Sequence, residues 1–129
     1  MSVITVFSGT FCKDEPVVKN VLSATGYNLV TDNDIVAEAS RLSGMPANII
    51  MRAFSAKESV FNNFTHEKYV STACLKLAVA EKLSGDELLI SGFTGWLIPN
   101  SISHVLRVCI IADMKFRTSH AAAEQKISE

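Results

Sequence analysis

The residues whose types and spacing suit chemistry best lie directly after the first apolar run, in the segment Gly9 to Pro16. Val3 to Phe7 is a β-branched and apolar run, which is typical of a strand that is buried on both faces. Pro16 suits the first turn of a helix, because N–H groups there have no acceptor within the helix and a proline costs no hydrogen bond. A strand, a glycine turn and a helix N-terminus, in this order, present N–H groups and a positive helix end to an anion. The segment therefore has the architecture of a phosphate-binding turn, with Gly9 and Lys13 in it.

This turn departs from the P-loop pattern G-x-x-x-x-G-K-[ST], in which the lysine reaches the phosphates and the hydroxyl holds Mg²⁺. Counted from Gly9, the last three places of the pattern hold Asp14, Glu15 and Pro16. Two carboxylates thus stand where a phosphate needs positive charge, and Lys13 is the cation close enough to compensate. Taken alone, the turn favours an ordinary strand-to-helix connection, capped by Asp14 or Glu15, over intact nucleotide chemistry.

The composition predicts a single domain over residues 1–129 and argues against several kinds of partner. The chain is 48% hydrophobic and 19% charged, which suits one globular domain with a sizeable core. Its 12 Lys and Arg nearly balance its 13 Asp and Glu, so the net charge of −1 gives no field that would attract nucleic acid. No run approaches the roughly 18 apolar residues of a membrane span. We therefore expect no nucleic-acid partner and no membrane partner.

The cysteines indicate a reducing compartment. There are three of them, widely spaced and without a C-x-x-C pair, which favours the cytoplasm over a disulfide framework. Cys74 and Cys109 lie in apolar segments and are expected in the core, whereas Cys12 lies in a turn that can expose it. No metal site is expected, because His66 has no partners at ligand spacing.

Strands and helices alternate along the chain. The expected strands are Val3 to Phe7, Tyr27 to Val30, Glu87 to Ser91 and His104 to Ala112, the last being the most hydrophobic. Helical spacing of apolar residues predicts helices between them, and Gly26 and Ser43-Gly44 end the first two. This order predicts an α/β fold, a three-layer parallel sheet with helices on both faces and right-handed crossovers.

Local patterns predict how single helices begin and pack. Thr31 or Asp32 caps the second helix, which places Asp32 and Asp34 in its first turn, where capping is favoured over ligand contact. Pro46 begins a short helix that continues towards Phe54. The helix after Thr65 is expected to bury the stripe Val70, Ala73, Cys74, Leu77 and Ala80. Asp113 caps a last helix that carries Arg117, and the tail from Ala121 has no apolar stripe.

Ligands of parallel sheets bind beyond the carboxyl ends of the strands. Four segments are expected at that edge: Gly9 to Lys13, Thr31 to Asp34, Ser91 to Thr94 and Asp113 to Arg117.

Taken together, these segments resemble the cytidylate-kinase-like branch of the P-loop nucleoside monophosphate kinases. Three stretches carry the resemblance, which covers roughly Val3 to Thr118: VITVFSG, YNLVTDNDIVAEASRLSG and LLISGFTGWLIPNSISHVLRVCIIADMKFR. The resemblance implies ATP and Mg²⁺ as ligands, with binding that is weak or lost. It also implies that a lid and a final strand lie beyond Glu129, so that the chain is the N-terminal part of a longer bacterial protein with a further domain.

The resemblance assigns four residues to nucleotide or phosphate binding, and the turn itself adds a fifth. Gly9 matches the start of the phosphate loop and Asp32 the acidic position near the monophosphate site. Gly92 matches the glycine after the third strand, and Arg117 the arginine at the start of the lid helix; Lys13 joins them as the cation of the turn. The Gly-Lys-Ser/Thr core is absent, and Phe93 stands where the family has an arginine after Gly92.

Three functions follow as hypotheses. The first is a degenerate, non-catalytic domain that senses a nucleotide, regulates or oligomerises. The second is an active ATP-dependent nucleoside monophosphate (CMP-type) kinase, in which Lys13 substitutes for the loop lysine. The third is a structural domain that binds no nucleotide and forms a homo-oligomer. Its candidate surface comprises Phe61, Phe64, Trp96 and the last helix, although these are better explained as core or loop anchors.

Overall fold

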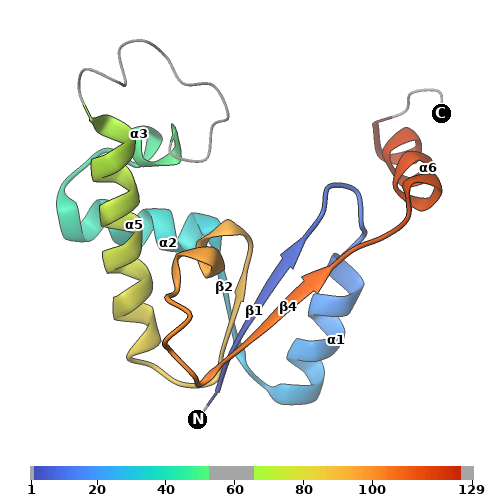
Figure 1. Cartoon of the computed structure of the whole chain (residues 1–129), viewed down its shortest axis with the longest axis horizontal. Helices are drawn as coiled ribbons and strands as arrows, with labels where there is room; N and C mark the ends of the chain where they lie inside the picture. The colour runs from blue at the N-terminus through green and yellow to red at the C-terminus, as the bar shows by residue number, and fades with distance from the viewer. Residues whose placement is uncertain (1, 53–65, 126–129) are drawn as a thin grey trace.

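The sheet has four strands, all parallel. The computed structural model describes residues 2–52 and 66–125. The strands are β1 (Val3–Ser8), β2 (Asn28–Thr31), β3 (Leu88–Ser91) and β4 (Val105–Ile110). They lie in the order β2-β3-β1-β4 (Figure 1). Val3 of β1 is in register with Leu88 of β3 and with Val105 of β4. The predicted parallel α/β sheet is confirmed.

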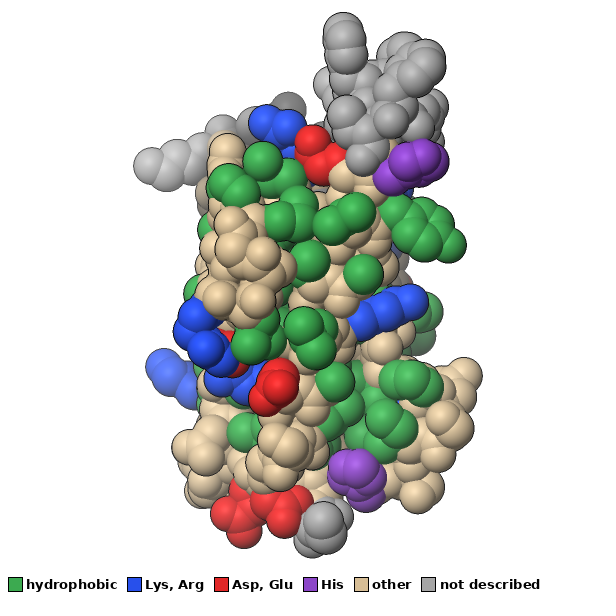
Figure 2. All heavy atoms as spheres, turned by 90° about the vertical axis from the view of Figure 1, so that its left-hand side faces the viewer, with side chains coloured by type: hydrophobic (Ala, Val, Ile, Leu, Met, Phe, Trp, Pro, Cys, Tyr) green, Lys and Arg blue, Asp and Glu red, His purple; other side chains and the backbone are tan. Residues whose placement is uncertain are grey.

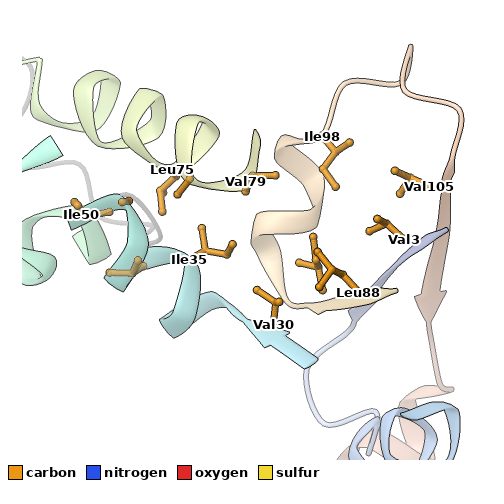
Figure 3. Packing of buried hydrophobic residues seen from close by; sticks show 13 residues of the cluster. Val3, Val30, Ile35, Ile50, Leu75, Val79, Leu88, Ile98 and Val105 are labelled. Atoms are coloured by element: carbon orange, nitrogen blue, oxygen red, sulfur yellow. The ribbon is translucent and has the colours of Figure 1, made fainter. Parts of the chain in front are cut away.

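Helices cover both faces of this sheet. The helices of the described residues are α1 (Glu15–Thr25), α2 (Asp32–Ser43), α3 (Ala47–Met51), α5 (Glu67–Leu83), the 3₁₀ helix η2 (Phe93–Leu97) and α6 (Met114–Gln125). Of these, α6 lies beyond the end of β4 and buries none of its described residues (Figure 1). On one face Val18 of α1 packs against Val6 and Leu89. On the other, Ile35 of α2 and Leu75 of α5 belong to a larger buried cluster that includes Val3, Ile50 and Leu88 (Figure 3). The alternation of side chains along each strand supplies both cores, which confirms the three layers.

The ends of α2 agree with the sequence, but the start of α1 does not. Thr31 and Asp34 form a capping box at the start of α2, and Gly44 ends the helix in the left-handed region at φ 74°. Asp14 occupies the N-cap position of α1 but makes no side-chain cap hydrogen bond. Its backbone is in the right-handed helical region, at φ −77° and ψ −20°, whereas a capping side chain normally needs an extended residue. In addition, Pro16 in the first turn has no N–H to receive a cap.

The stripe predicted for α5 is wrong. Its buried residues are Ser71, Leu75, Ala78 and Val79. Val70 and Leu77 are 47% and 49% exposed, and Figure 2 shows hydrophobic side chains on the side of the molecule where α5 lies. The predicted face and the buried face of α5 both adjoin Cys74. The buried face contains the polar Ser71, so it is less apolar in sequence than the predicted one. His66 precedes α5 in a left-handed conformation; Phe54, Thr65 and the segment with Phe61 and Phe64 lie outside the described residues.

The burial expected of Cys109 is wrong, and Cys12 is not exposed by its turn. Because β4 is an edge strand, it has a neighbouring strand on one side alone; Leu106 within it is 60% exposed, and Ile111 directly after it is 82% exposed. Cys109 is exposed for the same reason and is not a core residue. Cys12 is buried, because the turn folds its sulfur back towards Gly9; a Cβ on Gly9 would lie 3.1 Å from Cys12 Sγ.

Candidate functional site

The turn after β1 forms one wall of a cleft at the carboxyl edge of the sheet. The cleft has a volume of about 680 Å³ and is lined by residues 7–16 together with Phe93, His120 and Glu124. Figure 1 shows this turn and α6 at the same end of the sheet. The strand, turn and helix that the sequence predicted are therefore in place, and the cleft opens where parallel sheets bind ligands.

The turn holds its backbone in an unusual shape. The N–H of Gly9 donates to the carbonyl of Ile110 (3.1 Å), and the N–H of Cys12 donates to the carbonyl of Gly9 (3.3 Å). Phe11 and Lys13 both have left-handed backbones, with φ of 59° and 55°, which costs an ordinary residue about 1–2 kcal/mol. Left-handed Lys13 followed by right-handed Asp14 is the alternation that turns successive N–H groups to one side and forms an anion-binding concavity.

Arg117 reaches this turn from the other end of the chain. Its Nε donates to the carbonyl oxygen of Thr10 at 2.8 Å. The helix that carries it is capped as predicted, since Asp113 Oδ1 accepts from the N–H of Phe116 at 2.8 Å. No described residue of α6 is buried. Arg117 is therefore a specific link between α6 and the turn, and it brings a guanidinium to the edge of the cleft.

Asp32 and Gly92 form a second group at the same edge. The carboxylate of Asp32 accepts from the N–H of Phe93 through Oδ2 (3.0 Å), and from the N–H and hydroxyl of Thr94 through Oδ1 (3.0 and 2.8 Å). Gly92 has a φ of 120°, and a Cβ there would lie 2.3 Å from Asp32 Oδ2. Only glycine allows this approach, so the two residues together fix where η2 begins.

Aromatic rings connect the turn after β1 with the group formed by Asp32 and Gly92. Phe7 of β1 makes edge-to-face contacts with Phe93 and Trp96 of η2, each with ring centroids 5.3 Å apart. Phe93 also lines the cleft. Of the five predicted site residues, Gly9, Lys13 and Arg117 thus meet at the turn. Asp32 and Gly92 meet beside it, where they position the residue that closes the cleft on that side.

His120 and Glu124 of α6 also line the cleft, and neither was predicted from the sequence as a site residue. His120 Nε2 lies 3.5 Å from Glu124 Oε2. The residues had a detectable signal: α6 continues to Gln125, and the spacing 117, 120 and 124 places the three side chains on one helix face.

The charge around the cleft is mixed. Lys13 and Arg117 are opposed by Asp14, Glu15 and Glu124, so an anion entering the cleft meets carboxylates as well as cations. Across residues 2–52 and 66–125, no group of three or more His, Cys, Asp or Glu side chains is arranged to hold a metal ion. Within the same ranges, no helix has both the length and the hydrophobicity needed to cross a membrane.

A family model described as the cytidylate kinase-like family matches residues 3–129. The chain belongs to the cytidylate kinase-like family. Membership in this family associates the chain with nucleotide and Mg²⁺ binding in general terms, and it confirms the resemblance read from the sequence. No curated protein matches the chain in sequence.

A solved structure supports the fold of this family member. The crystal structure of TT1252 from Thermus thermophilus matches with a TM-score of 0.55 and 15% sequence identity. The match covers 98% of this chain and 74% of that chain. At this identity the likeness concerns the fold alone.

Proposed function

We propose that this cytidylate kinase-like domain binds a nucleotide through its phosphates but does not transfer a phosphoryl group. The observation that carries the proposal is the turn after β1. It keeps the shape of an anion-binding loop, while Asp14 and Glu15 occupy the places of the glycine and lysine of a P-loop.

Transfer depends on positive charge that is already positioned in the ground state. A P-loop supplies a lysine to the β- and γ-phosphates and a hydroxyl to Mg²⁺; here those places hold Glu15 and Pro16. Loss of one positioned donor in comparable sites costs about 2.7–4 kcal/mol of transition-state stabilisation. Loss of both, with a carboxylate added, leaves too little stabilisation for useful turnover, and any ATP or Mg²⁺ binding is weakened.

The turn still offers cations and N–H donors that can bind a phosphate without transferring it. In the proposed complex Lys13 and Arg117 neutralise part of the phosphate charge, and the N–H groups from Gly9 onward contact its oxygens. Asp32 and Gly92 act by position, because they hold Phe93 against the cleft. Such a site suits a regulatory or nucleotide-sensing role.

The chain offers a matched test of this proposal. The double variant Asp14→Gly/Glu15→Lys restores the P-loop residue types, and we expect it to raise ATP affinity about tenfold or more, measured by calorimetric titration. Asp86→Gly/Glu87→Lys makes the same two replacements in an exposed Asp-Glu pair immediately before β3, so it changes the net charge equally at the other edge of the sheet. An equal gain in both variants would mean that charge alone acts, and that the turn is no phosphate site.

The alternative function is an active nucleoside monophosphate kinase. The contact of Arg117 with Thr10 favours it, since a lid arginine beside the loop is what phosphoryl transfer needs. It predicts Mg²⁺- and ATP-dependent phosphorylation of CMP that is lost in Lys13→Gln. Absence of product at millimolar substrate would leave the binding role standing. Homo-oligomerisation stays a prediction, for which the exposed side chains of α5 offer a surface.

A further inference from the structure

A second pocket lies on the sheet face next to η2, apart from the cleft beside the turn after β1. Its floor is formed by neighbouring residues of β1 and β4, where Thr5 is in register with Arg107 and Phe7 with Cys109. Trp96 and Ile98 form the wall. η2 sits directly on the sheet, since a Cβ on its Gly95 would lie 3.0 Å from Thr5 Cβ. Phe7 is the one lining residue that both sites share among the described residues.

The size and walls of this pocket restrict what it can hold. Its volume is about 250 Å³. A cavity of about 150 Å³ accepts benzene, and pockets for drug-sized ligands begin at about 300 Å³, so one or two fused rings fit here. Trp96 is 70% exposed, and its ring meets that of Phe7 edge-to-face, which leaves indole surface for a planar ligand to stack on.

The polar groups of the pocket select the charge of the ligand. Arg107 is the one charged side chain among the described lining residues, and no carboxylate lines the pocket. Nη2 of Arg107 donates to the carbonyl of Pro99 at 2.9 Å, which holds the guanidinium at the rim. A guanidinium has five N–H donors in a fixed fork, so the remaining donors suit a carboxylate.

We propose that this pocket binds a small planar aromatic carboxylate, with its rings against Trp96 and Phe7 and its carboxylate on Arg107. The site is independent of the proposed nucleotide function. Stacking supplies affinity, and the guanidinium makes the pocket prefer the anion over a neutral ring of the same shape.

The test compares 2-naphthoate with neutral 2-naphthol at pH 7, by calorimetry on the whole chain. We expect naphthoate to bind at least tenfold more tightly. Arg107→Gln removes this preference and leaves naphthol binding unchanged, whereas the matched charge control Lys19→Gln, on α1 at the opposite face, changes neither. Cys109→Phe fills the pocket from an exposed position of the edge strand and abolishes binding of both ligands.

Two results would overturn the proposal. One is the absence of selectivity: naphthoate and naphthol bind with equal affinity, or Arg107→Gln weakens the binding of both equally. Either observation would indicate a non-selective apolar surface. The other is unchanged binding in Cys109→Phe, which would place the ligand elsewhere. Lys13→Gln separates the two sites, since it weakens nucleotide binding and leaves naphthoate binding intact.

Discussion

Replacement of Asp32 by alanine tests how the edge of the candidate site is held. The carboxylate accepts three hydrogen bonds from residues that lie 61 and 62 positions away in the chain. Two of them come from Thr94, which is fully buried. When Asp32 is truncated, the N–H and hydroxyl of Thr94 lose their acceptor in a place that water reaches poorly.

The size of the effect follows from this difference in burial. Hydrogen bonds to a charged group contribute about 1.5–3 kcal/mol each, and water replaces the exposed bond to Phe93 at little cost. For the two bonds from Thr94, we therefore expect Asp32→Ala to lower the free energy of unfolding by about 3–6 kcal/mol. Urea unfolding followed by circular dichroism measures this loss, and Trp96, the single tryptophan, reports on η2 through its fluorescence.

The control is Asn33→Ala, an exposed neighbour in the same helical turn. A loss in Asp32→Ala within about 0.5 kcal/mol of the loss in Asn33→Ala would refute the reasoning, since that is the usual range for surface substitutions. Unchanged Trp96 fluorescence in a folded Asp32→Ala protein would also show that the carboxylate does not position η2.

Three further predictions concern single side chains. Hydrogen bonds from the N–H and hydroxyl of Thr31 hold the pKa of Asp34 below its ordinary value. Its contribution to stability is therefore present above the ordinary pKa of an aspartate and is lost as the pH falls through the lowered one; Asp34→Asn should flatten this part of the stability profile. Ser71 Oγ is buried without a hydrogen-bond partner in the described structure, so Ser71→Ala should keep or raise the free energy of unfolding, by up to about 1 kcal/mol in urea titrations; a loss above 1 kcal/mol would reveal a partner. With a thiol reagent, Cys109 should react first and buried Cys12 last, and the reverse order, read by mass spectrometry, would contradict the burial described.

The sequence was sufficient to predict the fold because its signals are local. Apolar runs located the strands, and Gly26 and Gly44 located two helix ends at left-handed residues. The capping box of Thr31 and Asp34 needs only neighbours in the chain. Right-handed crossovers between parallel strands then place all carboxyl ends at one edge, which is why the candidate site residues could be gathered before any coordinates were known.

The failures share a different cause, because they depend on tertiary neighbours. The hydrophobic run of β4 does not indicate that the strand lies at the edge of the sheet, so Cys109 was expected in the core. Nothing near Asp32 in the chain indicates that its partners are Phe93 and Thr94. The buried face of α5 was ambiguous because Ser71 interrupts it, and burial against α2 decided the choice.

In the proposed complex, nucleotide phosphates bind the turn after β1 without the Mg²⁺ chemistry of a kinase. A thermal-shift titration of the chain with ATP, ADP, CMP and CTP, with and without Mg²⁺, tests this binding most directly. At about 100 times the dissociation constant, a ligand that binds only the folded state adds about 2.7 kcal/mol, which raises the melting temperature by several degrees. We expect ATP and ADP to raise the melting temperature, and by the same amount with and without Mg²⁺. No shift with any nucleotide, from a sample that unfolds cooperatively, would contradict the proposal.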